Sequence, residues 1–534
     1  MENEDAVAVP CLLHDLVDQA AARAPHGPAL VCRERRLDYQ ELAALQDAFA
    51  AGVARLGLAP RTRIGIYLSK SIEAVAASFG ATKAGACFVP INPVLKPRQV
   101  GHILRDCGVA VLVTSPERHA QLRAQLADCP GLQLVVLTGA PPAAAIAATC
   151  GWDAFIDAPV VPAARTLDSD MAAILYTSGS TGAPKGVVVS HRNLVSGAAS
   201  VASYLHNGPF DRILALLPLS FDAGFSQLTT GFLSGACVVL HEYLHAGDVL
   251  RTMAQERITG ITAVPPVWIQ LTEQAWPPEA GRYLRYVANT GGKMPREILG
   301  RLRRLAPAAL PYLMYGLTEA FRSTFLAPDQ VDLRADSIGK AIPNQEIMVQ
   351  RPDGQPCAPD EPGELVHRGS TVSLGYWNDP AKTAERFRVL PPRQDGLVLP
   401  EYAVFSGDTV RMDQDGYLYF IGRLDEMIKC CGYRVSPTEV EELVYETGLV
   451  REVAAFGVAH ERLGQAVALV VLPADAGSFT EAALLAALRP VLPHYMLPHT
   501  VMVSAAPLPR NGNGKMDRAG LARGDYRFTA EMAA

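Results

Sequence analysis

The chain has 534 residues, a length that predicts two or more domains rather than one simple core. Hydrophobic residues make up 49% and charged residues 19%, a balance typical of globular proteins and not of disordered ones. The formal net charge is -6, and no Lys/Arg run is interleaved with aromatic residues, so nucleic acid is not an expected partner.

The sequence also carries no sign of membrane insertion or export. No apolar stretch approaches the length that spans a bilayer, and residues 1–25 are acidic where a signal or transit peptide would be basic. Ten cysteines are scattered without a C-x-x-C pair or a histidine cluster at metal-ligand spacing. We therefore expect a cytoplasmic protein with reduced thiols and no transmembrane segment.

Apolar runs rich in β-branched residues alternate with helical patterns along most of the chain. Residues 39–57 and 71–85 place apolar side chains at helical spacing. This alternation predicts parallel sheets that are covered by helices. Strands are predicted at residues 63–69, 87–92, 109–115, 132–138, 236–241 and 261–266.

The stretch "ILYTSGSTGAPKGVVVSH", residues 174–191, predicts a polar loop between two strands. Gly179 and Lys185 keep the spacing of a Walker phosphate loop, but Pro184 lacks the required N–H and Gly186 replaces the magnesium-binding hydroxyl. Such a loop can still bind phosphate, because it is rich in hydroxyl and amide donors; the alternative is a polar hairpin without a ligand. The donors come from Thr177, Ser178, Gly179, Ser180, Thr181, Gly182 and Lys185.

"YTSGSTGAPKGV" resembles the phosphate loop of the adenylate-forming superfamily, which includes acyl-CoA synthetases, aryl-CoA ligases, amino-acid adenylation domains and firefly-type luciferases. Further stretches that resemble the family follow in family order, so the resemblance covers almost the whole chain. Three stretches, "VPPVWIQL", "YGLTEAFRST" and "SIGKAIPN", resemble the exosortase-linked acyl-CoA ligases. The others are "TKAGACFVPINP", "MYGLTEA", "GELVHRG", "FSGDTVRMDQDGYLYFIGRLDEMIKCCGYRVSPTEVE" and "PLPRNGNGKMDR".

The resemblance implies an α/β fold with two domains. Residues 1–424 would form a large ATP- and acyl-binding domain of parallel sheets covered by helices, with a small β-barrel-like part. Residues 425–534 would form a small mobile α+β domain, and this segment has its own amphipathic helix pattern at 436–446. Asp425 resembles the hinge between the domains; the alternative is an i,i+4 pair with Lys429.

The reaction implied by the resemblance has two steps. The carboxylate of a small-molecule acid attacks the α-phosphate of ATP, which gives an acyl-adenylate and pyrophosphate. A thiol, either that of CoA or that of a carrier protein's phosphopantetheine, then takes the acyl group and releases AMP. The first step brings anions together, so cations and donors must stabilise the charge that develops at phosphorus.

Several residues match family positions around the nucleotide. In "YGLTE", Tyr315 would stack on adenine, Gly316 would contact ATP, Thr318 would donate to the α-phosphate and Glu319 would bind Mg²⁺. Thr318 and Glu319 are also a good helix-start pair, and the two interpretations are compatible.

Three further residues complete the expected nucleotide site. Asp408 would accept hydrogen bonds from both ribose hydroxyls; the alternative is an aspartate that only stabilises a turn. Arg423 resembles the family's second contact with the ribose. Lys515, after "RNGNG", would enter the site during adenylation. The residues expected to take part in catalysis are Lys185, Thr318, Glu319 and Lys515.

The resemblance places the acyl pocket in four segments. Phe221, Phe225 and Trp268 would supply apolar walls, the loop at Gly291 and Gly292 would close one side, and Gly432 would leave room for a pantetheine arm. Three charges, those of Asp222, Lys293 and Arg322, fall in the same segments. Either they pair with one another or they meet a polar substrate, and a long plain fatty acid is disfavoured because buried unpaired charge is costly.

Four functions remain open from the residues and the resemblance. The first is a stand-alone acid–CoA ligase, and the second is an adenylation enzyme that loads an acyl or peptidyl carrier protein. A luciferase-like monooxygenase and a non-catalytic nucleotide-binding protein are the others. The joint presence of Lys185, Glu319, Asp408, Arg423 and Lys515 argues against loss of catalysis.

Overall fold

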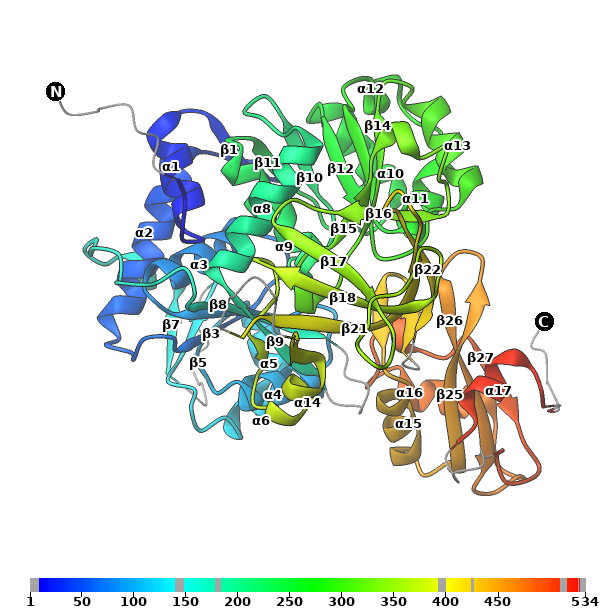
Figure 1. The fold of residues 1–534 in the computed structure, drawn as a ribbon. Coiled ribbons are helices and arrows are strands. Elements are labelled where there is room, and N and C mark those ends of the chain that lie inside the picture. Colours follow the sequence, from blue (N-terminus) through cyan, green and yellow to red (C-terminus); the bar gives the residue numbers. More distant parts are fainter. Residues whose placement is uncertain are drawn as a thin grey trace.

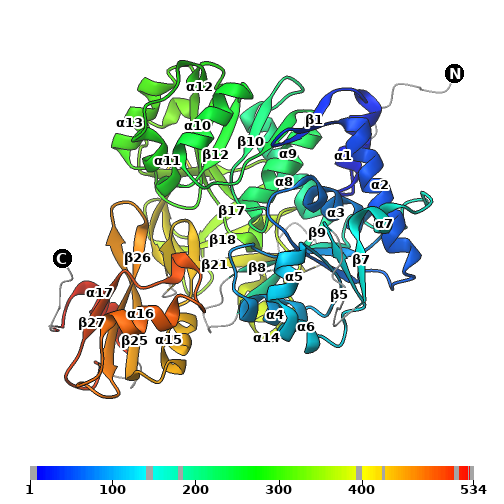
Figure 2. The same ribbon diagram turned by 180° about the vertical axis from the view of Figure 1, so that it is seen from behind.

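Two large sheets and a smaller third sheet organise the chain (Figures 1 and 2). The structure is a computed structural model that describes residues 9–139, 148–177, 184–391, 400–423, 427–509, 516–526 and 528. Within these residues, the first sheet has eight strands in the order β19-β9-β8-β4-β3-β5-β6-β7. Its strands are β3 (Arg63–Tyr67), β4 (Cys87–Pro90), β5 (Val109–Thr114), β6 (Leu134–Leu137), β7 (Thr149–Gly151), β8 (Met171–Thr177), β9 (Lys185–Ser190) and β19 (Gly375–Tyr376).

The second sheet has 14 strands in the described part of the chain and is mixed. Its parallel part is β1, β11, β10, β12, β13 and β14, and antiparallel strands continue it from β15 onward. In the described residues these antiparallel strands continue the large sheet, where a small β-barrel-like part was expected. The strands are β1 (Pro28–Cys32), β2 (Arg35–Asp38), β10 (Arg212–Ala215), β11 (Cys237–Leu240), β12 (Gly260–Ala263), β13 (Tyr286–Asn289), β14 (Leu310–Tyr315), β15 (Thr324–Leu326), β16 (Ser337–Ala341), β17 (Gln345–Gln350), β18 (Gly363–Gly369), β20 (Phe387–Val389), β21 (Tyr402–Met412) and β22 (Leu418–Arg423).

Helices α3 and α9 are buried between the two large sheets. Nearly every residue of both helices is buried, because each packs against a layer on either side, and Phe79 of α3 stacks on Phe225 of α9. The helices before the C-terminal domain are α1 (Asp15–Arg23), α2 (Tyr39–Arg55), α3 (Ile72–Lys83), α4 (Pro97–Asp106), α5 (Pro116–Gln121), α6 (Arg123–Ala127), α7 (Trp152–Ile156), α8 (His191–Leu205), α9 (Asp222–Leu233), α10 (Ala246–Gln255), α11 (Pro265–Thr272), α12 (Pro278–Arg282), α13 (Arg296–Leu305) and α14 (Pro380–Arg386).

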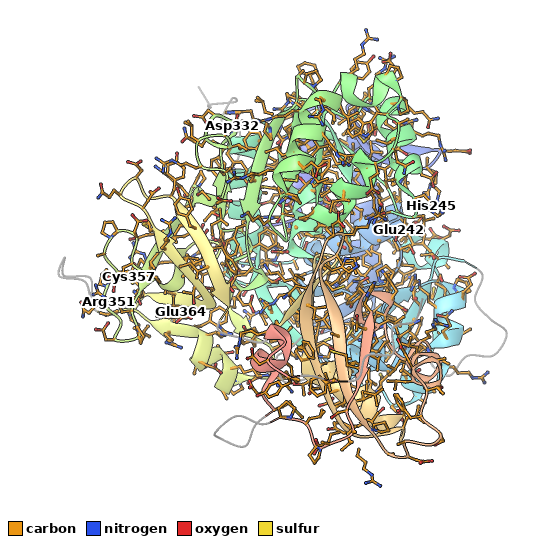
Figure 3. The ribbon with its side chains drawn as sticks, turned by 90° about the vertical axis from the view of Figure 1, so that its right-hand side faces the viewer. Glu242, His245, Asp332, Arg351, Cys357 and Glu364 are labelled. Carbon is orange, nitrogen blue, oxygen red and sulfur yellow. The ribbon has the colours of Figure 1, made fainter. Side chains whose placement is uncertain are left out.

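A small C-terminal domain, orange to red in Figure 1, packs below α10 to α13 and beside β21 and β22. Arg351, Cys357 and Glu364 mark the edge of the antiparallel strands in Figure 3, on the side away from Glu242 and His245. The domain has its own core, in which α15 packs on β25 and β26. Its elements are β23 (Ile428–Cys430), β24 (Tyr433–Val435), α15 (Pro437–Glu446), β25 (Val450–His460), β26 (Gly464–Pro473), α16 (Glu481–Leu488), β27 (Thr500–Val503) and α17 (Arg518–Arg523).

The predicted fold class, an α/β large domain followed by a small α+β domain, is confirmed. The strand and helix patterns read from the sequence fall on β3, β4, β5, β6, β11, β12, α2 and α3. The proposed boundary at residues 424 and 425 lies outside the described residues, between β22 in the 14-stranded sheet and β23 in the small domain's sheet. In the described part of the chain, no helix combines the length and the apolar character needed to cross a bilayer.

Helix α9 begins where two backbone segments touch. A Cβ at Gly224 would lie 1.9 Å from the carbonyl oxygen of Pro218, so Gly224→Ala should lower the midpoint of thermal unfolding; overpacking a core costs about 1–3 kcal/mol. The matched control is Gly247→Ala in α10, where a Cβ meets nothing within 4 Å and alanine is the better helix former. Equal midpoints for the two variants, measured by calorimetry, would contradict this tight packing.

Candidate functional site

The polar loop predicted from the sequence connects two antiparallel strands of the eight-stranded sheet. Thr177 ends β8 and lies opposite Lys185, which begins β9. The strand–loop–strand prediction is therefore confirmed for the flanking strands. The buried Thr177 Oγ1 has no hydrogen-bond partner among the described residues. The other predicted loop donors, Ser178, Gly179, Ser180, Thr181 and Gly182, lie outside the described residues.

The segment after β14 brings Glu319 to this loop from the other large sheet. The Tyr376 hydroxyl donates to Glu319 Oε1 at 2.7 Å and accepts from Lys185 Nζ at 2.8 Å. The Lys185 ammonium also lies 3.5 Å from Glu319 Oε1 and 4.0 Å from the centroid of the Tyr376 ring. Lys185, Glu319 and Tyr376 therefore form a compact buried cluster where the two sheets meet.

Neighbouring charges keep the Glu319 carboxylate ionised. Burial lowers the pKa of Lys185 from its ordinary value. Burial would also raise the pKa of Glu319, but the charges of Lys185 and Arg434 outweigh it and hold the pKa of Glu319 at about 2. Glu319 is therefore ionised at neutral pH.

Glu319 also has the donor set of a hard-cation ligand. Its side chain is 4% exposed, and its Oε2 atom has no hydrogen-bond partner among the described residues. An ionised carboxylate oxygen that is buried without a partner is costly unless a ligand meets it, and Mg²⁺ prefers such oxygens. The residues present therefore fit the expected magnesium ion.

A hydrogen bond joins Asp408 and Tyr315. The Tyr315 hydroxyl donates to Asp408 Oδ2, which joins the end of β14 to β21. Arg423 lies opposite Asp408 in the antiparallel ladder of β21 and β22. The Arg423 side chain is outside the described part of the structure. The structure thus brings the predicted ribose and adenine residues together. Gly316 and Thr318 line the cavity between them and Glu319.

The small domain closes this cavity of about 160 Å³. Tyr433, Arg434 and Glu439 of the small domain line it together with Asp408 and Thr318. Lys515 and Asp425, which sequence reasoning placed in this region, lie outside the described residues.

Several contacts dock the small domain in this position, among them an ion pair between Arg98 and Glu446. The Gln99 amide donates to Glu439 Oε1 at 2.8 Å, Arg462 pairs with Glu273 at 2.9 Å, and the ring of Tyr433 meets that of Phe221 edge-on at 4.8 Å.

Gly432 lies at a junction between two cavities. Gly291, Lys429 and Gly432 line both the site cavity and a second cavity of about 720 Å³, which Gly292 and Lys293 also line. Gly432 has a φ of 82°, and a Cβ there would lie 2.8 Å from Val264 Cγ1. A side chain at Gly432 would therefore crowd Val264 at this junction; the pantetheine role of Gly432 stays a prediction.

Two of the three predicted apolar walls are wrong. Phe221 lines the site cavity. Phe225 instead packs against Phe79 and Phe88 in the core between the sheets, and Trp268 is fully buried in the core beneath α10 and α13. Helical periodicity explains the errors, because each of these side chains points from its helix away from the cavity and into the packed layer.

The three predicted pocket charges separate. Lys293 is exposed and pairs with Asp336 at 2.7 Å, so it does not reach the acyl cavity. Asp222 and Arg322 both line that cavity, but they form no ion pair within 4.0 Å among the described residues. Mutual pairing of all three charges is therefore wrong.

A strained backbone precedes Arg322. Phe321 is buried and has a φ of 52°, a conformation that bulky residues rarely adopt. Gly197 accommodates its ring, because a Cβ at Gly197 would lie 2.6 Å from Phe321 Cδ1. This kink turns the chain between Glu319 and Arg322.

Sequence reasoning missed Tyr376, Arg434 and the Gln99–Glu439 contact. Tyr376 sits on a two-residue strand that pairs with β9, and nothing in "LGYWNDP" indicates that its hydroxyl reaches Lys185. "GYRVSP" adjoins the predicted Gly432 and could have pointed to Arg434. The burial of Glu439 raises its pKa to about 7, an effect that Glu442 strengthens and that Gln99 and Arg98 oppose.

Comparison with known proteins identifies the family of this site. Residues 17–377 match the family model described as AMP-binding enzyme, and residues 439–515 match that of the AMP-binding enzyme C-terminal domain. Feruloyl-CoA synthase from Amycolatopsis sp is 33% identical over 503 residues, which cover 93% of this chain and 95% of that protein.

Other relatives are much longer than this chain. Tyrocidine synthase 3 from Brevibacillus parabrevis is 30% identical over 528 residues, which cover 97% of this chain but 8% of that protein. A solved structure of an o-succinylbenzoate CoA synthetase double mutant from Bacillus subtilis, bound with a product analogue, shares the fold with a TM-score of 0.82. Its identity is 24%, with 96% of this chain and 98% of that chain covered. Because the first family model spans well over half of its length, this chain belongs to the AMP-binding enzyme family.

Proposed function

We propose that the protein is an AMP-forming acid–thiol ligase. It activates a carboxylic acid with ATP to an acyl-adenylate, releases pyrophosphate, and transfers the acyl group to a thiol, that of CoA. The observation that carries the proposal is the buried Lys185–Tyr376–Glu319 cluster. Its chain neighbours Pro184 and Thr318 line the same cavity as Asp408. Membership of the exosortase-linked subgroup stays a prediction.

The cluster supplies charge where the first step needs it. Lys185 and the loop donors hold the phosphates, Thr318 donates to the α-phosphate, and Asp408 with Arg423 holds the ribose while Tyr315 faces adenine. Glu319 would hold Mg²⁺, which would supply positive charge to the phosphates. Lys515 acts at the carboxylate in this step. Because its cation acts mainly in the transition state, it raises the rate of adenylation rather than the affinity for substrate.

The observed position of the small domain suits the second step. Gly432 faces Gly291 at the junction of the two cavities, so a thiol that enters through the larger cavity reaches the acyl group there. Lys515 serves the first step from a different domain position, and the change occurs at a hinge at Asp425, between strands that belong to separate sheets.

A carrier protein's phosphopantetheine is the alternative thiol. The match of 97% of this chain to part of a tyrocidine synthase supports it, whereas the match over 95% of the length of feruloyl-CoA synthase supports CoA. Pyrophosphate exchange over a panel of acids tests the first step. Addition of free CoA to the best acid then separates the acceptors, since thioester formation without a carrier protein requires CoA itself.

The Tyr376 hydroxyl holds both charged members of the cluster. Tyr376→Phe should reduce the rate of ATP–pyrophosphate exchange by roughly 10–100-fold. This factor corresponds to the free energy of a hydrogen bond to a charged group. Tyr283→Phe, far from the cluster on the C-cap of α12, is the matched control and should keep the wild-type rate. An unchanged rate in Tyr376→Phe would remove the hydroxyl from the mechanism.

Gly432 should matter for the second step alone. In Gly432→Leu the side chain narrows the passage at Val264, so thioester formation should fall by roughly 100-fold, the cost of a displaced reactant. Pyrophosphate exchange should stay within roughly threefold of wild type. Gly448→Leu, also at positive φ and with nothing within 4 Å of a Cβ, controls for backbone strain. Equal losses in both steps for Gly432→Leu would contradict a role confined to thiol entry.

Glu439 makes domain docking pH-dependent. Its pKa is about 7 when docked and near 4.5 when exposed, so docking takes up a proton and is favoured at low pH. From pH 6 to pH 8 the docking constant should fall roughly tenfold, and with it the rate of thiol transfer from pre-formed acyl-adenylate.

Glu439→Gln keeps the hydrogen bond with Gln99 but cannot ionise, so it should flatten this part of the pH profile. Glu481→Gln, in the first turn of α16, removes a carboxylate that does not shift the pKa of Glu439 and should not flatten the profile. A wild-type profile in Glu439→Gln would assign the pH dependence to another group.

A further inference from the structure

Arg322 is a buried cation that has no partner of opposite charge among the described residues. Its side chain is 3% exposed and lines both the site cavity and a small chamber behind it. Its hydrogen bond to Thr290 Oγ1 is long at 3.5 Å, and its Nε atom has no partner in the described part of the chain. No described carboxylate lies within 4.0 Å of its guanidinium.

The Arg322 guanidinium cannot lose its buried charge by deprotonation, since it stays protonated at every pH that a folded protein tolerates. A charge that is buried without a counterion is strongly destabilising, so its retention in a cavity wall indicates that a ligand supplies the counterion. The geometry of the guanidinium suits a planar anion that accepts two parallel hydrogen bonds, which describes a carboxylate.

Asp222 does not fill that role. It begins helix α9 and lines the cavity, where its Oδ1 accepts the Ala223 N–H at 2.7 Å, but it forms no ion pair with Arg322 among the described residues. Burial raises the pKa of Asp222, and the charge of Arg322 opposes this effect from a distance. The described walls of the cavity thus present an unpaired cation on one side and an acceptor for an N–H or O–H donor on another.

The chamber behind Arg322 is small and partly polar. Its volume is about 20 Å³, roughly the space that one water molecule needs. The polar side chains of Ser226, Gln227, Thr230 and Thr262 contribute to its wall, and Thr230 Oγ1 has no partner among the described residues. A long alkyl chain has no room there, and apolar groups would leave these polar atoms unsatisfied.

We infer that the acid which this enzyme activates is a short dicarboxylic acid, and that Arg322 binds the carboxylate which does not react. The inference rests on the proposed ligase activity and names its substrate class. The reacting carboxylate lies toward Thr318 and Lys185, where charge develops at phosphorus. The second carboxylate pairs with Arg322 at the mouth of the small chamber.

Matched substrates test the inference on the full chain. Succinate, glutarate, aspartate and glutamate are compared with butyrate, pentanoate, 2-aminobutyrate and norvaline, in which a methyl group replaces the second carboxylate. In ATP–pyrophosphate exchange, at least one dicarboxylic acid should exceed its methyl partner in kcat/KM by roughly 10–100-fold. Methyl partners that perform as well as or better than the dicarboxylic acids in all four pairs would overturn the inference.

Variants then assign the preference to Arg322. Arg322→Met should abolish the ratio between the best pair, chiefly through KM for the dicarboxylic acid, while the methyl partner keeps its rate or improves. Arg322→Lys should restore part of the ratio. The stabilisation against heat that the best dicarboxylic acid gives without ATP should also disappear in Arg322→Met. Arg282→Met, which removes an exposed arginine paired with Glu279, is the control and should keep the ratio.

Failure of the inference differs from failure of the proposed function. If aromatic or long aliphatic acids alone drive pyrophosphate exchange, the ligase stands and the substrate class falls. If no acid of any class drives exchange, the ligase falls and this inference falls with it. An Arg322→Met variant that folds and keeps the wild-type ratio would also overturn the inference.

Discussion

The contact of Lys185 with Glu319 through Tyr376 ties the two large sheets together at the site. Lys185 begins a strand of the eight-stranded sheet, Glu319 follows a strand of the 14-stranded sheet, and Tyr376 pairs with the strand of Lys185. Removing one partner of a buried ion pair lowers the free energy of unfolding by about 3–5 kcal/mol. The surrounding packing must therefore hold all the members of the cluster within contact. That packing is the apolar layer of α3 and α9, which fixes the distance between the sheets.

The small domain completes the site rather than merely covering it. Arg434 contributes to the low pKa of Glu319, Tyr433 packs on Phe221, and Glu439 reaches Gln99 of the large domain. The observed domain position therefore affects the pKa of Glu319, the lining of the site cavity and the junction between the two cavities. In the proposed ligase, movement of this domain would link the two chemical steps.

Much of the fold could be predicted from the sequence, because strands and helices follow from local apolar periodicity. The loop between β8 and β9 was recognisable because proline and glycine at fixed positions exclude the Walker geometry. Side-chain direction was harder to predict. Phe225 and Trp268 sit in the predicted segments but on the core-facing side of their helices, and Lys293 reaches out to Asp336. Tyr376 joins the site through a pairing between strands far apart in the chain, which no local pattern reveals.

The left-handed backbone at Phe321 separates a residue of the nucleotide site, Glu319, from a residue of the substrate pocket, Arg322. Glu319 lies before the kink and Arg322 lies after it, so replacement of Arg322 leaves the carboxylate before the kink in register. A relative with another residue at position 322 would thus accept a different acid substrate and keep the same nucleotide chemistry. The constraint falls instead on Gly197 in a distant helix, where any side chain would meet the ring that supports the kink.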